Sequence, residues 1–133
     1  MAIKPLEPAI YALLAANSGV TTLVSTRIYR MILPQNATLP AITFDLIGAD
    51  VESAMGADHS LVAKTLQVDS WATSHATARS VMDAARAALQ RYHGTQSTTV
   101  IQTILWTNEY SLYEKDTKYF HLINDFRVFY TEV

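Results

Sequence analysis

Histidines are the side chains of this chain with the clearest potential for chemistry, because histidine is the commonest acid–base and metal-binding residue near neutral pH. The sequence contains 4 of them. His75 and His93 fall at the two ends of one expected helix, too far apart to share a metal ion. His121 falls in an expected strand beside Tyr119 and Ile123, where a partly buried or interfacial imidazole accounts for it without catalysis.

Acidic residues and the fourth histidine gather in the segment 50–60, a connection roughly twice as long as an ordinary hairpin loop. The residues concerned are Asp50, Glu52, Asp58 and His59. Carboxylate oxygens are ligands for hard divalent cations, yet this spacing matches no calcium-binding loop. We therefore expect an exposed polar loop with a functional contact, and a divalent-cation site is the alternative.

Other catalytic patterns are missing from the sequence. It contains no cysteine, which excludes disulfides, zinc ribbons and thiol catalysis. No Gly-x-Ser-x-Gly elbow is present, and the isolated glycines form neither a Walker loop nor a dinucleotide fingerprint. The sequence therefore predicts a protein that is not an enzyme and that binds no cofactor and no metal.

The composition indicates a single folded domain over residues 1–133. Hydrophobic residues make up 50% of the chain and charged residues 17%, which excludes a disordered protein. The formal net charge is -2 and no basic stripe is present, so a lone subunit is not expected to bind DNA tightly. The N-terminus has no apolar stretch long enough for a signal peptide or a membrane span, so we expect the protein to stay in the cytoplasm.

The first third of the chain predicts a helix followed by two strands. The helix lies between Pro5 and Gly19, because proline is tolerated in a first turn and glycine favours a stop, and a further turn follows over 20–24. Strands are expected over 27–33 and 41–49, joined by a loop that contains proline and asparagine.

The middle of the chain has the clearest periodicity. A strand over Leu61–Ala72 alternates with a period of two, which gives it one apolar face, and it can return antiparallel beside 41–49. An amphipathic helix follows, capped by Thr73 or Ser74 and stopped before Gly94. The apolar stripe of this helix must lie on a sheet.

Two long strands are expected at the C-terminus, over 98–113 and 118–132, around the turn 114–117. Each would extend roughly 45 Å, at about 3.3 Å per residue, against about 17–20 Å for an ordinary strand. We therefore expect an α/β (α+β) fold. It consists of a mostly antiparallel sheet of four to five strands with two helices packed on it, in the order α-β-β-β-α-β-β, and a long C-terminal hairpin.

Both faces of that hairpin carry bulky apolar residues, more than two helices can cover. On its first strand, alternation puts Val100, Ile104, Trp106 and Tyr110 on one face and Ile101, Leu105 and Tyr113 on the other. Soluble monomers seldom leave large apolar patches in water, whereas subunit interfaces place aromatic residues there. We therefore predict self-assembly through the hairpin. The alternative is a strongly twisted hairpin whose second face is covered by loops and by the first helix.

Five short segments between residues 20 and 72 form a recognisable series. They are VTTLV at 20–24, RIY at 27–29, PQ at 34–35, PAITF at 40–44 and QVDSWA at 67–72. In order and spacing this series, continued through the amphipathic helix, resembles the tail-completion proteins of long-tailed bacteriophages and related gene-transfer particles. These are small tail-terminator or neck proteins. The likeness covers about residues 12–92, and the C-terminal hairpin agrees only in general pattern.

The resemblance implies a structural protein of the virion, assembled in the host cytoplasm. Such proteins form a ring, commonly of six subunits, on the end of the finished tail tube and offer a joining surface to the head connector. Their fold is an α/β sandwich, in agreement with the elements expected from the residues. Neither catalysis nor a membrane is implied, and DNA would be only cargo in the channel.

On this hypothesis the interface residues lie in the hairpin and in the segments that carry the resemblance. They are Trp106, Tyr119, Ile123, Phe129, Trp71 and Arg27. For Arg27 and Trp71, a packing role is an equal alternative. The acidic segment 50–60 would contact an axial partner or face the channel, where its carboxylates would repel DNA phosphates.

Other interpretations stay open at this point. Within the structural class, the chain could be a head–tail adaptor or a relative of the tail-tube protein. A different class is a small cytosolic enzyme whose site forms at a subunit interface from the acids and histidine of segment 50–60. A bacterial interaction module is a third alternative.

Overall fold

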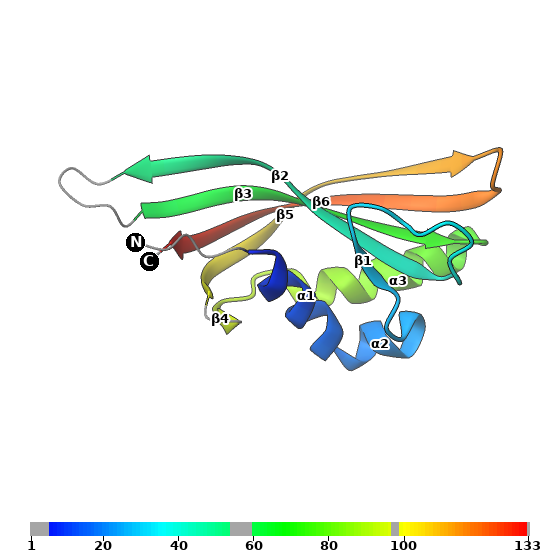
Figure 1. The fold of residues 1–133 in the computed structure, drawn as a ribbon, viewed down its shortest axis with the longest axis horizontal. Helices are drawn as coiled ribbons and strands as arrows, with labels where there is room; N and C mark the ends of the chain where they lie inside the picture. Colours follow the sequence, from blue (N-terminus) through cyan, green and yellow to red (C-terminus); the bar gives the residue numbers. More distant parts are fainter. Residues whose placement is uncertain (1–5, 54–59, 97–98, 133) are drawn as a thin grey trace.

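The computed structural model describes residues 6–53, 60–96 and 99–132, and within them one six-stranded sheet carries three helices on one face (Figure 1). The helices are α1 (Glu7–Ala16), α2 (Ser18–Val24) and α3 (His75–Leu89). The strands are β1 (Ile28–Arg30), β2 (Ala41–Ser53), β3 (Ser60–Ala72), β4 (Gly94–Gln96), β5 (Thr99–Glu114) and β6 (Tyr119–Glu132). Their order across the sheet is β1-β2-β3-β6-β5-β4, and each neighbouring pair is antiparallel except β1 and β2, which are parallel.

The mixed α/β class and the mostly antiparallel sheet are confirmed, but the expected four to five strands and two helices are too few. The described residues contain six strands and three helices. The sequence patterns missed β4, because its 3 residues are too few to show an alternation with a period of two. They also gave α2 as a mere extra turn, although the Asn17 side chain caps it by accepting a hydrogen bond from the Val20 N–H at 3.1 Å.

The core lies between the helices and one face of the sheet, as the periodicity of the middle segment predicts. The inward residues of β3 are buried, and so is the apolar stripe of α3 that packs on β3 and β6. The buried side chains from these two elements are Val62, Leu66, Val68, Ala72, Ala78, Val81, Met82, Ala85 and Leu89. From β6 the same layer receives Phe126, Val128 and Tyr130, and α1 adds Ile10 and Leu14.

Of the two helix caps expected for α3, only the N-terminal one is confirmed. Ser74 is the N-cap, since its hydroxyl accepts a hydrogen bond from the Thr77 N–H at 3.2 Å. Gly94 was expected to end the helix, but α3 ends at Leu89 and Arg91 takes the left-handed conformation, with φ of 60°. Gly94 instead begins β4.

The predicted C-terminal hairpin is confirmed, with strands of 16 and 14 residues, but the predicted faces of β5 are wrong. Irregularities between Ile101 and Thr103 and between Trp106 and Asn108 each insert one residue into β5. Because an inserted residue reverses the alternation of side chains, Ile101 and Ile104 are both buried although they are three positions apart.

The segment expected to be a long loop is shorter than predicted. β2 continues to Ser53 rather than ending near residue 49, because a bulge at Gly48 lets the strand go on. Gly48 has φ of +74°, a conformation that costs other residues energy. Asp50 and Glu52 are therefore strand residues, whereas Asp58 and His59 lie outside the described residues.

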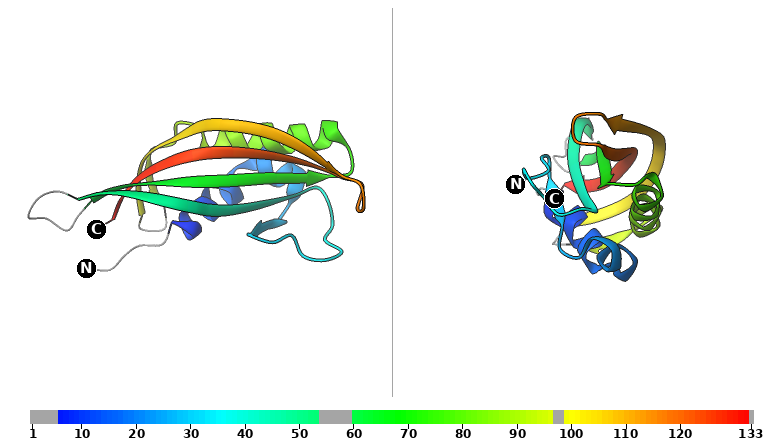
Figure 2. Two further views of the ribbon diagram at one scale, coloured as in Figure 1. Left: turned by 90° about the horizontal axis from the view of Figure 1, so that it is seen from above. Right: turned by 90° about the vertical axis from the view of Figure 1, so that its right-hand side faces the viewer.

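The four long strands curl into a trough when the molecule is viewed end-on (Figure 2). The helices cover the middle of the sheet, and the ends of β2 and β3 extend well past them (Figure 1). The curl agrees with the alternative interpretation of the sequence, a strongly twisted hairpin. It does not remove all apolar side chains from the surface of the described residues.

The N-cap of α3 offers a test of the fold. Replacing Ser74 by alanine leaves the Thr77 N–H without its acceptor and should lower the free energy of unfolding by about 1 kcal/mol. Urea denaturation measures this loss. The control is Ser80→Ala on the exposed side of the same helix, which should cost nothing because alanine is the better helix former. Equal effects of the two changes would contradict the assigned cap.

Candidate assembly surface

The structure divides the six residues predicted to form an interface into four groups. Ile123 is only 5% exposed, so its side chain belongs to the subunit interior rather than to a free surface. Arg27 and Trp71 make contacts within the chain, and Tyr119 and Phe129 are half-buried. Trp106 is 38% exposed.

Arg27 ties three segments of its own chain together. Its Nε donates a hydrogen bond to the Pro40 carbonyl at 2.9 Å, and its Nη2 donates to the Leu23 carbonyl at 3.4 Å. The guanidinium thus joins the end of α2 to the residue that precedes β2. This supports the packing role that the sequence left as an alternative.

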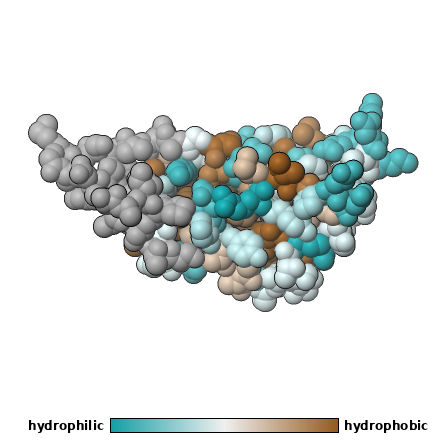
Figure 3. Space-filling view, in the orientation of Figure 1, coloured by the Kyte–Doolittle hydropathy of each residue, from teal (hydrophilic) through white to brown (hydrophobic). Residues whose placement is uncertain are grey.

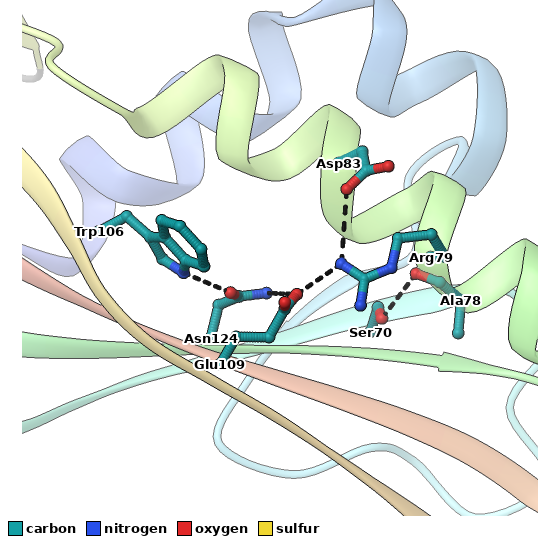
Figure 4. Close-up of polar contacts among 7 residues, drawn as sticks. All are labelled: Ser70, Ala78, Arg79, Asp83, Trp106, Glu109 and Asn124. Atoms are coloured by element: carbon teal, nitrogen blue, oxygen red, sulfur yellow. Dashed lines mark hydrogen bonds and ion pairs between the residues drawn. The ribbon is translucent and has the colours of Figure 1, made fainter.

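Trp106 belongs to a polar network that connects β5 and β6 to α3 (Figure 4). Its indole Nε1–H donates to Oδ1 of Asn124 at 2.6 Å, and the Arg86 guanidinium lies 4.6 Å from its ring centroid. The Asn124 amide donates in turn to Glu109 at 3.4 Å, and Glu109 forms an ion pair with Arg79. Asn124 is fully buried, so these partners satisfy a polar group that would otherwise destabilise the core.

The charges of this network shift each other's titration. The hydrogen bond from Arg79 lowers the pKa of Glu109 below its ordinary value, and the positive charge of Arg79 acts in the same direction. The hydrogen bond to Glu109 raises the pKa of Arg79. Asp83, one turn along α3, lies 3.6 Å from the same guanidinium nitrogen and is a weaker partner.

A second cluster lies on the sheet face that has no helices. The Nε2–H of His121 donates to Oδ2 of Asp69 at 2.8 Å, and the imidazole stacks on Trp71 with ring centroids 3.7 Å apart. Trp71 Nε1 donates to the Thr43 hydroxyl at 2.9 Å. His121 is therefore a buried packing residue, in agreement with the interpretation of the sequence.

A pocket of about 580 Å³ adjoins this cluster at the turn end of the hairpin. The loop that follows β1 forms one wall, and Trp71, Glu114 and Tyr119 form the other. At its rim, Met31 and Ile32 are 66% and 73% exposed. Tyr119 therefore lines a pocket, and this position is compatible with the predicted interface role.

The most exposed apolar side chains of the hairpin were not among the predicted interface residues. They are Tyr110, Leu112 and Tyr113, all in the third of β5 that is nearest the turn to β6. Hydrophobic side chains stand among polar ones on the sheet in Figure 3. The signal was present in the sequence as the run YSLY, but the inserted residues in β5 hid which positions face the helices.

The acidic segment contributes little that can be placed. Asp50 and Glu52 pair in the β2 backbone with Ala63 and Leu61 of β3. In the part of the chain that the structure describes, no group of three or more His, Cys, Asp or Glu residues could hold a metal ion. No helix in that part is long and apolar enough to cross a membrane.

Comparison with known proteins decides what kind of protein carries these surfaces. The chain matches the family described as Tail completion protein gp17 over residues 8–131. The chain belongs to this tail completion protein family. No curated protein matches it.

The fold of this tail completion protein recurs in a solved virion. A chain of the structure described as "Virion of native gene transfer agent (GTA) particle" superposes with a TM-score of 0.76 and 19% identity. The match covers 96% of this chain and 95% of that chain, so the whole architecture is shared.

Family membership confirms the resemblance that the sequence segments carried. The tail completion protein is a structural component of the virion tail and not an enzyme.

The Arg79–Glu109 pair predicts a specific dependence of stability on pH. Because the folded pKa of Glu109 is lowered, its stabilisation is present above the ordinary value of 4.5 and is lost as the pH falls through the folded pKa. Arg79→Met should cost about 0.2–1 kcal/mol at neutral pH and almost nothing in strong acid. Urea denaturation at both pH values measures the difference.

Asp83→Asn is the matched control for that experiment. It removes the more distant carboxylate, at 3.6 Å from Arg79, and should cost less at neutral pH. If Arg79→Met destabilised the protein equally at both pH values, packing of the arginine stem rather than its charge would be responsible.

Proposed function

We propose that this tail completion protein closes the end of the tail tube as a hexameric ring and presents the joining surface to the head connector. The ring partners are further copies of the chain, the tail-tube protein on one side and the connector or adaptor on the other. DNA passes through the central channel without being bound.

The observation that carries this proposal is the set of exposed apolar residues at the turn end of the hairpin. Tyr110, Leu112 and Tyr113 project from β5, and Met31 and Ile32 project from the loop beside it. Apolar side chains so exposed are costly for a solitary soluble protein and usual at subunit contacts. A ring of identical subunits covers such surfaces by head-to-tail contact.

The acidic segment supplies the second part of the proposal. Asp50 and Glu52 lie in β2 where the strand extends past the helices, and Asp58 and His59 follow in the sequence. We assign this end of the subunit to an axial partner or to the channel wall. Carboxylates along a channel repel phosphate groups and so allow DNA to pass without adhering.

Leu112 is the residue of choice for testing the ring. It is 52% exposed, so Leu112→Asp should leave the subunit folded while placing a charge in the proposed contact. We expect at least about a tenfold loss of capped tails, which corresponds to about 1.4 kcal/mol of contact energy. Electron microscopy of the tails measures the result, with overlong or uncapped tubes as the expected defect.

The control is Thr22→Asp, at an exposed position on α2, which is not part of the hairpin. Trp106 is a poorer choice, because its indole holds Asn124 and Arg86 and a charge there would disturb the subunit itself. Normal tails from Leu112→Asp, together with normal tails in the complete absence of the gene, would overturn the proposed function.

A further inference from the structure

The outermost strands of the sheet are so short that most of each neighbouring strand has an uncovered outer edge. β1 pairs with β2 over Ile42–Phe44, and β4 pairs with β5 over Thr99–Ile101. β2 and β5 are 13 and 16 residues long, so long stretches of both remain. The strand registers place β1 and β4 at opposite ends of the sheet, which leaves the two free edges at diagonal corners (Figure 1).

On β5, the chain covers its own edge only as far as Trp106. The Arg91 N–H donates to the Ile104 carbonyl at 2.7 Å, and the Gln90 side-chain oxygen accepts from the Trp106 N–H at 2.6 Å. Within the described residues, no backbone group donates to or accepts from the outer edge of Thr107–Glu114. Seven residues of regular strand, 108–114, are thus open to another strand.

On β2, the covered part ends at Leu46. The Met31 N–H donates to the Phe44 carbonyl at 2.8 Å, and the Asp45 carboxylate accepts from the Leu46 N–H at 2.8 Å. A side chain here occupies a position where a further strand would place its carbonyl. Beyond it, among the described residues, the outer edge of Ile47–Ser53 has no strand partner.

The free edge of β5 lacks most of the devices that keep sheet edges apart. Native edges are protected by lysine, by proline, by inward charges, by bulges or by short length, and here the bulge lies only at the first residue, Thr107. Residues 107–114 read TNEYSLYE, without lysine, arginine, proline or glycine, and Glu109 is already paired with Arg79. The exposed Tyr110, Leu112 and Tyr113 flank this backbone and would be buried by an added strand.

We propose that the free edge of β5 in one copy pairs antiparallel with the free edge of β2 in the next copy, so that the sheets join around the ring. The inference rests on the proposed ring and specifies how its subunits bind one another. β2 and β5 run in opposite directions within one sheet, so two copies in the same orientation present antiparallel edges.

Head-to-tail pairing satisfies both edges, whereas a symmetric pair of β5 strands would leave every β2 edge open. The free edges lie at opposite ends, so neighbouring copies are offset along the strands. A closed ring absorbs that offset as strand tilt, as closed barrels do.

Charge disfavours one competing arrangement. β2 carries Asp45, Asp50 and Glu52 and no basic residue, so contact between two β2 edges would bring like charges together. On the free edge of β5, Glu109 is already neutralised by its ion pair with Arg79.

Backbone alternation identifies the amides that the pairing would use. The Trp106 N–H points outward to Gln90, and the residue inserted after it shifts the outward positions to Glu109, Ser111 and Tyr113. The Glu114 carbonyl accepts from Lys118 across the turn, as an inward-pointing residue should. On β2 the same argument, with the bulge at Gly48, makes Val51 outward.

Proline at an outward position removes the donor without touching the inner ladder. Ser111→Pro and Val51→Pro should each reduce self-association of the purified chain, or incorporation into capped tails, by at least about tenfold. Ser111→Ala and Val51→Ile keep the N–H and should assemble normally. Urea denaturation of all four verifies that the subunits are folded.

Mixing the two proline variants tests the head-to-tail geometry. Each retains one intact edge, so together they should form a 1:1 dimer by analytical ultracentrifugation, whereas neither should associate alone. Self-association of Val51→Pro by itself would overturn the pairing in favour of symmetric β5 contacts.

Hydrogen exchange separates this inference from the proposed function. In assemblies of the unaltered chain, free or on tube ends, the amides of Glu109, Ser111 and Tyr113 should exchange at least about tenfold more slowly than in the monomer. A ring in which those amides exchange as fast as in the monomer would overturn the strand pairing alone. Absence of any assembly, in solution and on tails, would overturn both.

Discussion

Burial of one face of a long sheet under a short helical layer is the constraint on which the rest of this structure depends. The four long strands have 13, 13, 16 and 14 residues, while the helices that cover them have 10, 7 and 15. The layer is well packed where both are present, with Leu66, Phe126 and Met82 fully or almost fully buried. Where the sheet outruns the helices, at the ends of β2 and β3, the outer edge of β2 has no strand partner among the described residues. On the face without helices, Tyr110 and Leu112 remain exposed because no second layer covers them. The exposed surfaces therefore follow from a helical layer that covers one face only, and only the middle of a long sheet.

The polar network between α3 and the hairpin decides how those surfaces are presented. Arg79, Glu109, Asn124 and Trp106 connect α3 to β5 and β6 halfway along the strands (Figure 4). A hairpin held at that point projects its outer part in a defined direction, so less conformational entropy is lost when a partner binds. The network thus performs two tasks: it satisfies the buried Asn124 amide and it orients the free end of β5.

The sequence predicted those elements whose periodicity extends over many residues and failed where a single residue changes the phase. The strand 61–72 and the helix after it were correct in position and in their buried faces, because each repeats its pattern several times. The predicted faces of β5 were wrong, since each inserted residue reverses the alternation of side chains, and the amino acids around the insertion give no sign of it. Ile123 was placed at an interface although it is interior, whereas Leu112 and Tyr113 were overlooked. The family was recognised from short segments such as QVDSWA, whose Trp71 and Asp69 prove to be packing residues.

One cluster of this protein resembles a catalytic site, but its geometry shows that its role is structural. His121 and Asp69 form a buried hydrogen-bonded pair, the arrangement that activates a nucleophile in many hydrolases. Here the imidazole face is covered by Trp71. Two hydroxyls on β2 and β3 are also engaged, because Thr43 accepts from Trp71 and Ser70 donates to the Ala78 carbonyl at 3.0 Å. The pair instead joins β3 to β6 on the face that no helix covers, where a curled sheet must fill its own hollow side. A structural protein can thus use a buried polar pair to hold two strands together at the turn end of its sheet, close to the exposed Leu112.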